Sequence, residues 1–261
     1  MTLHVWWDKP ADGPCNMAAD ELLAAEALER GTICMRIYGW HPATVSLGGF
    51  QRGADARAEP SIAGVPLVRR PSGGGAIVHG SDLTYAAAVP KTHPWGGRPQ
   101  LLYDALHESM RRTLGGFGVE ATLWRPSGPP ASPVSGEAFF CFDRRSSGDL
   151  VILGRESADG RGHKVMGSAQ RRLAATVLQH GSLLLRRNSD VPLAASHPGL
   201  DDLAEGGFSA ALIRPLVAAW IAAIAAPLGI AVVEESGRFK DEDVVRGKSH
   251  EFASDRWTWR R

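Results

Sequence analysis

A run of three glycines, Gly73 to Gly75, follows two arginines, a proline and a serine in the stretch RRPSGGGAIVHG, residues 69–80. Glycine adopts positive φ angles and brings the backbone close to a ligand, so that successive N–H groups can converge on an anion or a carbonyl oxygen. The spacing matches neither the phosphate-binding loop nor the dinucleotide fingerprint. By itself the run predicts either a loop that binds an acyl or phosphate group or a glycine-rich turn between two strands.

Lys164 is the second candidate for chemistry. It lies in GHKVMGSAQRR, residues 162–172, where apolar and polar residues alternate beside the small residues Gly167, Ser168 and Ala169. A lysine in such a half-buried strand would lie at the wall of a cleft, where its ammonium could face a carbonyl or phosphate group. Most lysines are simply solvated, so Lys164 becomes a candidate only together with other groups.

Three cysteines are present, Cys15, Cys34 and Cys141. This odd, low number argues against a disulfide framework and for a reducing compartment. Cys141 lies among phenylalanines after a proline- and serine-rich loop, and Arg144, Arg145 and Lys164 would favour its thiolate. The sequence therefore predicts that Cys141 is the reactive thiol and that the other two cysteines are structural.

Two histidines, His79 and His180, lie beside glycines and would serve either as bases or as hydrogen-bonded core residues. Taken singly, each is better explained as a core residue. The spacing of His, Cys and Asp residues suits no zinc site, so the sequence predicts no metal.

The elements that position these residues indicate an α+β fold, because strand patterns cluster in the middle of the chain and helical patterns lie at both ends. Helices are expected at about 16–29, 98–114 and 209–226, with a charged helix near the C-terminus. Asn16 is expected to cap the first helix. The apolar stretch 211–233 is interrupted by an arginine and two prolines, so we expect a buried helix and a short strand rather than a membrane span.

Charge and composition exclude some function classes. The formal net charge is +1, so no global field draws the protein to nucleic acid or anionic lipid. Charged residues make up 22% of the chain and hydrophobic residues 44%, as in ordinary globular proteins. The N-terminus has no signal-peptide pattern, and a cytoplasmic protein is expected.

Five motifs in order resemble the lipoate–protein ligase-like catalytic domain, a superfamily that includes lipoate–protein ligases, octanoyltransferases and, more distantly, biotin–protein ligases. They are NMAADE, VSLGGFQ, RRPSGGGAIVHG, KVMGSAQRR and LQHGSLLL. The resemblance implies mixed and antiparallel sheets flanked by helices, in a single catalytic domain over residues 1–261. Gly80 is a departure, since an acid is frequent there in the superfamily. The RRSSG segment, residues 144–148, is a second departure.

Within the superfamily, the CFD segment followed by DLVI, and DLTYAAAVP after the glycine loop, are most similar to the cysteine-dependent octanoyltransferases. That resemblance implies two steps. Cys141 would take an octanoyl group from octanoyl-acyl carrier protein as a thioester. A lysine of a lipoyl-carrier protein, either the glycine cleavage H protein or an E2 lipoyl domain, would then receive the group as an amide.

In this reaction Lys164 would stabilise the oxyanion, helped by N–H groups near Gly74 and Gly75, while Val78 and Leu83 would line an acyl tunnel. No cofactor is implied, and a monomer that binds neither nucleic acid nor membrane is expected. The substrate-binding residues implied are Arg70, Ser72, Gly73, Gly74, Gly75, Ala76, His79, Tyr85, Gly167, Ser168, Ala169, His180 and Gly181.

Two alternatives remain open. A lipoate–protein ligase would use ATP and Mg²⁺ to activate lipoate, with Lys164 on the carboxylate and phosphate and Cys141 as a bystander. The second alternative is a non-catalytic protein of the same fold that binds an acyl group or a carrier protein. The presence of both Cys141 and Lys164 counts against this alternative.

Overall fold

The computed structural model describes residues 1–126, 138–153, 160–189, 191, 197–237 and 239–261. Most of the predicted proline- and serine-rich loop therefore lies outside the described residues. Eleven strands in this part form one sheet of eight strands and one of three. The sheets are mixed and helices flank them, which confirms the predicted α+β class.

The large sheet has the order β11-β1-β2-β6-β10-β9-β8-β7. Strand β1 pairs in parallel with β2 and β11, and the remaining neighbours are antiparallel. The antiparallel part of the sheet runs from β2 to β7 and holds most of the strands expected in the middle of the chain. The strands are β1 (Thr2–Trp7), β2 (Ile33–Tyr38), β6 (Asp82–Pro90), β7 (Thr122–Leu123), β8 (Leu150–Ile152), β9 (His163–Arg172), β10 (Thr176–Leu184) and β11 (Ala231–Glu234).

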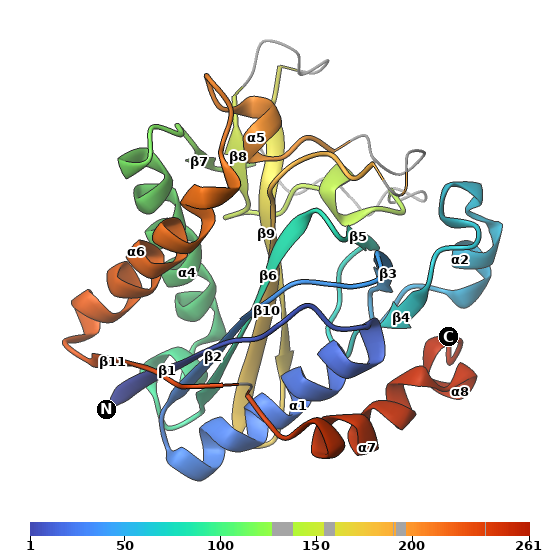
Figure 1. Ribbon diagram of the computed structural model, residues 1–261, viewed down its shortest axis with the longest axis horizontal. Coiled ribbons are helices and arrows are strands. Elements are labelled where there is room, and N and C mark those ends of the chain that lie inside the picture. The colour runs from blue at the N-terminus through green and yellow to red at the C-terminus, as the bar shows by residue number, and fades with distance from the viewer. Residues whose placement is uncertain (127–137, 154–159, 190, 192–196, 238) are drawn as a thin grey trace.

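Helices cover both faces of this sheet, α1 (Gly13–Arg30) and α7 (Glu242–Ala253) on one side, α4 (Pro99–Gly116) and α6 (Ile213–Ala225) on the other (Figure 1). The side chains of β2 point alternately to the two faces of the sheet, and this shows why a layer of helices is needed on each face. Ile33, Met35 and Ile37 belong to the core under α4 and α6, whereas Cys34 and Tyr38 belong to the core under α1 and α7. Successive side chains of a strand point to opposite faces, so a strand apolar on both faces must be covered twice.

The first helix starts at Gly13, three residues before the predicted start, so the prediction that Asn16 caps it was wrong. Asp12 is the cap, because its side chain accepts a hydrogen bond from the backbone N–H of Cys15 at 2.8 Å, and Pro14 fits the first turn. Asn16 instead donates its side-chain amide to the carbonyl oxygens of Ala11 and Gly39, both at 3.1 Å. It ties the helix to the segment that follows β2.

The small sheet has the order β4-β3-β5 and holds the glycine loop. Strands β4 (Leu67–Arg69) and β5 (Ile77–His79) flank β3 (Thr44–Leu47), and the loop connects β4 to β5. The strands predicted around the triple glycine are thereby confirmed. The remaining helices are short: α2 (Gly53–Ala58), α3 (Pro94–Gly97), α5 (Leu200–Leu203) and α8 (Asp255–Thr258), with 3-10 turns at Pro60–Ile62, Cys141–Asp143, Ala210–Leu212 and Ala226–Leu228.

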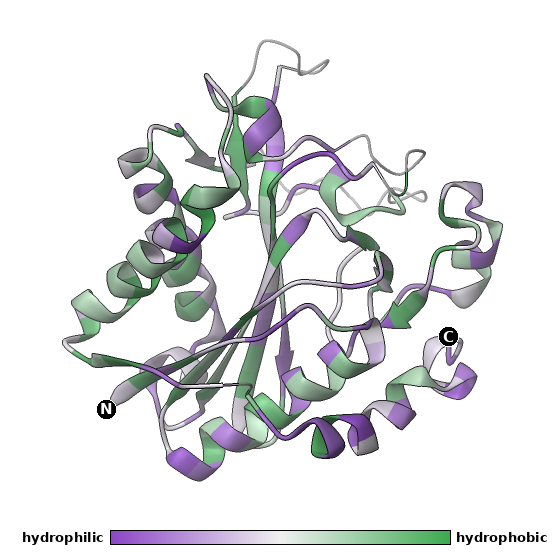
Figure 2. Cartoon of the chain, viewed as in Figure 1, coloured by the Kyte–Doolittle hydropathy of each residue, from purple (hydrophilic) through white to green (hydrophobic). Residues whose placement is uncertain are grey.

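Helix α6 is less buried than its sequence predicts. Leu216, Val217, Trp220 and Ile221 pack into the core, and the Trp220 indole donates to Leu106 O of α4 at 3.0 Å. The opposite face carries exposed alanines, and Figure 2 shows α6 mainly green and white where α7 alternates purple and green. The helical segment Ala210–Leu228 has the length and composition of a membrane span; one of its faces packs on the core.

Candidate functional site

Cys141 opens a 3-10 turn, Cys141–Asp143, that lies against the glycine loop. Ala76 and Phe140 form a β-bridge there. The N–H of Ala76 donates to Phe139 O at 2.9 Å, and the N–H of Cys141 donates to Ala76 O at 2.8 Å. These two bonds place a half-buried thiol beside the triple glycine, although the two segments are far apart in the chain.

Lys164 projects from β9 toward this thiol. Its Nζ lies 3.7 Å from Cys141 Sγ, 3.2 Å from Cys141 O and 3.3 Å from Arg144 O. The side chain is buried, so its charge acts where water screens it little. An ammonium in this position stabilises negative charge on the sulfur and on an oxyanion formed beside it.

Asp149 is a site residue that the sequence reasoning missed. Its carboxylate forms a buried ion pair with Lys164, at 2.9 Å between Nζ and Oδ2. It also accepts hydrogen bonds from the Tyr103 hydroxyl at 2.8 Å and from the Ser146 N–H at 2.6 Å. A buried cation needs such a partner. The signal was the acid of DLVI, directly before β8, a segment that the sequence offered as a motif of resemblance.

Two glycines have no room for a side chain at this centre. A Cβ on Gly75 would lie 2.7 Å from Cys141 N and 2.9 Å from Phe140 C. A Cβ on Gly167 would lie 2.5 Å from Lys164 Cε and 2.7 Å from its Nζ. Gly75 is needed for the approach of the cysteine turn, and Gly167 for the approach of the lysine.

A Gly75→Ala variant should therefore be less stable than the wild type by about 1–3 kcal/mol, because the atoms in the way belong to the backbone and cannot rotate aside. The measurement is the free energy of unfolding in urea. Gly115→Ala in α4 is the matched control, since its Cβ meets nothing within 4 Å; it should gain up to about 1 kcal/mol. Equal stability of Gly75→Ala and the wild type would contradict this reading of the contact.

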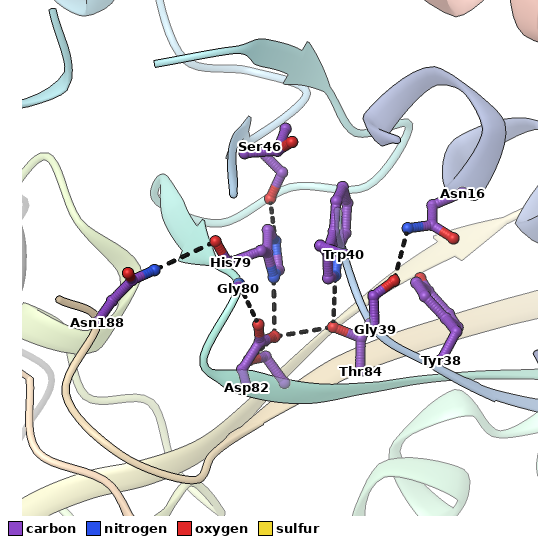
Figure 3. A network of polar contacts seen from close by, with 12 residues as sticks. Asn16, Tyr38, Gly39, Trp40, Ser46, His79, Gly80, Asp82, Thr84 and Asn188 are labelled. Atoms are coloured by element: carbon purple, nitrogen blue, oxygen red, sulfur yellow. Dashed lines mark hydrogen bonds and ion pairs between the residues drawn. The ribbon is translucent and has the colours of Figure 1, made fainter. Parts of the chain in front are cut away.

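His79 lies in a buried polar network that supports the glycine loop (Figure 3). Its Nδ1 is 2.8 Å from Asp82 Oδ2 and its Nε2 is 2.7 Å from Ser46 Oγ, while the Trp40 ring stacks on it at 3.9 Å. Burial lowers the pKa of His79, and the Asp82 carboxylate opposes that shift. Asp82 also accepts the Gly80 N–H at 3.1 Å. Asp82 therefore joins the imidazole of His79 to the backbone of Gly80.

Arg70 connects this network to the loop. Its Nη1 donates to Ser46 Oγ at 2.6 Å, and its Nη2 donates to Gly75 O at 2.8 Å and to Gly73 O at 3.2 Å. Burial lowers the pKa of Arg70 to about 10, so it remains charged at neutral pH. Arg70 therefore fixes the carbonyls of Gly73 and Gly75 and holds the loop in its conformation.

His180 fastens the other side of the loop to α1. Its Nε2 is hydrogen-bonded to Ser72 Oγ, and its Nδ1 is 3.2 Å from Asp20 Oδ2. Asp20 also accepts bonds from Arg36 at 2.7 Å and from the Tyr38 hydroxyl at 2.8 Å. Ser72 is buried, so this arrangement positions the loop and does not present a serine nucleophile.

Ser168 lies between Tyr85 and a histidine that the sequence reasoning missed, His107. Its Oγ is 2.7 Å from the Tyr85 hydroxyl and 2.6 Å from His107 Nε2. Because the Gly148 carbonyl, 2.8 Å from His107 Nδ1, can only accept, Nδ1 carries the proton and Ser168 donates to Nε2. Burial lowers the pKa of His107 to about 4, which keeps the ring neutral.

His107 should make the protein less stable in acid. The unfolded chain takes up a proton near the ordinary histidine pKa of about 6.5, whereas the folded chain does so only near pH 4. Its contribution is complete above pH 6.5 and falls as the pH drops toward 4, by about 2 kcal/mol at pH 5. Urea unfolding of the wild type and His107→Asn at pH 7.5 and 5.0 measures this. Equal pH dependence of the two proteins would contradict it.

These groups surround a pocket of about 390 Å³. Eleven of the predicted site residues line it: Arg70, Gly74, Gly75, His79, Cys141, Lys164, Gly167, Ser168, Ala169, His180 and Gly181. The other four predicted site residues are not in the lining, but each is hydrogen-bonded to a residue that is. Ser72 is bonded to His180, Gly73 to Arg70, Ala76 to Cys141 and Tyr85 to Ser168.

The tunnel predicted at Val78 and Leu83 is not where this pocket lies, because neither residue is in its lining. Alternation along β5 turns Ile77 and His79 toward the pocket and Val78 away from it, and Leu83 packs on the core beneath α4 and α6. The apolar and aromatic lining comes instead from Met17, Tyr38, Trp40 and Ile77. Across the described residues, no group of three or more His, Cys, Asp or Glu side chains is placed to hold a metal ion.

Comparison with known proteins agrees with this architecture. The model of the family described as the lipoyl protein ligase A/B catalytic domain matches residues 12–196. Octanoyltransferase LipM of Kyrpidia tusciae is 37% identical over 181 residues, which are 65% of this chain and 61% of the relative. LipM of Bacillus subtilis is 35% identical over 186 residues, 67% of this chain and 62% of the relative. This chain thus matches about three fifths of the length of each of these relatives.

Solved structures show the same fold. Protein Ta0514 of T. acidophilum superposes with a TM-score of 0.73 at 20% identity over the whole of both chains. Lipoate-protein ligase A bound with ATP superposes with a TM-score of 0.69 at 19% identity, over 99% of each chain.

Proposed function

Because the chain belongs to the lipoyl protein ligase A/B catalytic domain family, we propose that it is an octanoyltransferase of lipoate assembly, acting as a single catalytic domain over residues 1–261. The observation that carries the proposal is the buried Lys164 ammonium 3.7 Å from the Cys141 sulfur, at the wall of the pocket. The identity to LipM relatives supports the same activity.

In the first step the Cys141 thiolate attacks the thioester carbonyl of octanoyl-acyl carrier protein. The new bond joins Cys141 Sγ to the acyl carbon and the bond to the carrier's sulfur breaks. The carrier leaves as a thiolate, which takes up from solvent a proton equivalent to the one that Cys141 released on ionising. Lys164 stabilises the oxyanion together with the loop N–H groups near Gly74 and Gly75. Met17, Tyr38, Trp40 and Ile77 offer apolar surface to the octanoyl chain.

In the second step the acyl group passes to a lysine of a lipoyl-carrier protein, either a glycine cleavage H protein or an E2 lipoyl domain. Exchange between thioesters is nearly isoenergetic and conversion of a thioester into an amide is downhill, so the proposed reaction uses no ATP, metal or other cofactor. We propose that the enzyme works as a monomer in the cytoplasm.

Incubation of the pure protein with octanoyl-acyl carrier protein in the absence of nucleotide tests this, with intact-mass measurement as the readout. A transferase gains the mass of one octanoyl group. An ATP-dependent lipoate–protein ligase gains none, and instead releases pyrophosphate from ATP when lipoate is present. If neither signal is observed, the chain is a non-catalytic acyl- or carrier-binding protein.

A further inference from the structure

Asp143 is an exposed acid at the edge of the pocket. It ends the 3-10 turn that Cys141 begins, and both residues line the pocket. The other acid of the described lining, Asp149, is buried and paired with Lys164, whereas the Asp143 side chain is 45% exposed. The remaining charged side chains in that lining are cations: Arg70, Arg144, Arg145 and Lys164. A single accessible carboxylate therefore lies two residues from the nucleophile, in positive surroundings.

His197 holds this carboxylate in place. Its Nε2 lies 2.7 Å from Asp143 Oδ1, and its ring contacts those of Phe140 and Phe142, with centroids 6.1 and 5.9 Å away. The hydrogen bond to His197 lowers the pKa of Asp143 against the opposing effect of partial burial. The contact uses Oδ1, so Oδ2 of the half-exposed carboxylate can receive a cationic ligand at the pocket edge.

The second step of the reaction brings such a cation. A lysine side chain arrives as an ammonium at neutral pH. After it has lost one proton and attacked the acyl carbon, its nitrogen is positively charged again. A fixed carboxylate beside the thioester would bind the arriving ammonium and stabilise the charge that reappears on the nitrogen as the bond forms.

We propose that Asp143, positioned by His197, binds the ε-ammonium of the acceptor lysine and stabilises its nitrogen during attack on octanoyl-Cys141. This inference rests on the proposed function and assigns the acceptor side of the same site. The N–C bond forms and the C–S bond breaks. The nitrogen loses one proton to solvent before attack and a second through Asp143 to solvent after it, and sulfur leaves as a thiolate paired with Lys164.

The test separates the two steps. Wild type and Asp143→Asn are loaded from octanoyl-acyl carrier protein, freed of donor, and divided into two portions. One portion receives a lipoyl domain, and the other receives hydroxylamine at pH 7, a nucleophile that is mostly uncharged and needs no ammonium site. Intact mass follows the decay of the acyl-enzyme in both, and rates are taken only from loaded molecules.

We expect the ratio of the lysine rate to the hydroxylamine rate to fall roughly 10- to 100-fold in Asp143→Asn, as for the loss of one hydrogen bond to a charged group. Asp243→Asn, which changes an exposed acid on α7, should keep the wild-type ratio. His197→Ala should lower the ratio, and His197→Gln, which can still donate to Asp143, should restore it.

The outcomes that overturn the inference are distinct from those that overturn the proposed function. If the wild type loads but Asp143→Asn keeps its ratio, Asp143 does not receive the lysine. If both rates fall equally, Asp143 only maintains the cysteine turn. If the wild type does not load, the transferase proposal fails and this inference fails with it.

Discussion

A Cys141→Ser variant is expected to form no octanoyl thioester and to lose transfer by more than about a thousandfold. A serine hydroxyl at this position is not ionised near neutral pH, whereas a thiolate 3.7 Å from the Lys164 ammonium is a strong nucleophile. Intact mass after incubation with octanoyl-acyl carrier protein measures the adduct, and octanoylation of a lipoyl domain measures turnover.

Cys15→Ser is the matched control for this substitution. Burial raises the pKa of the Cys15 thiol, and it raises that of Cys34 to about 12, so neither should react near neutral pH. Cys15→Ser should load like the wild type. An octanoyl thioester, recognised by its cleavage with hydroxylamine at pH 7, that persists in Cys141→Ser or disappears in Cys15→Ser would assign the nucleophile elsewhere.

Loss of Lys164 should have the second-largest effect. Lys164→Ala should lower the rate of loading by roughly two to three orders of magnitude, because it removes the buried charge beside the sulfur and the oxyanion. The overall fold should be kept. The same change leaves the Asp149 carboxylate buried without its cation, although the bonds from Tyr103 and Ser146 remain. We therefore also expect a loss of stability of about 3–5 kcal/mol.

A double variant separates these two effects. Lys164→Met with Asp149→Asn removes both buried charges and keeps a hydrogen-bonding side chain for Tyr103. It should regain most of the stability in urea unfolding while its single-turnover loading stays as slow as that of Lys164→Ala. A double variant that loads at the wild-type rate would show that Lys164 has no part in the chemistry.

The sequence by itself determined the features that depend on near neighbours. Helical and strand patterns identified α4, α7 and the strands around the glycine loop, and the order of the motifs indicated the family. Residue type together with close neighbours in the chain marked Cys141 and Lys164, since the arginines after the cysteine and the small residues after the lysine set them apart from the other cysteines and lysines. At the start of the first helix two nearby residues, Asp12 and Asn16, could each cap the helix, and Asp12 is the residue that does so.

Only the tertiary structure decided which distant groups meet. The bridge between Ala76 and Phe140 brings the thiol to the glycines, and the pair of His180 and Asp20 joins residues 160 positions apart. Asp149 and His107 acquire their partners in the same way. A pairing of this kind is fixed by how sheets and helices stack, and stacking depends on the burial of whole faces rather than on any short stretch. The tertiary structure also decided which face of its strand each side chain occupies. For this reason Ile77 rather than Val78 lines the pocket.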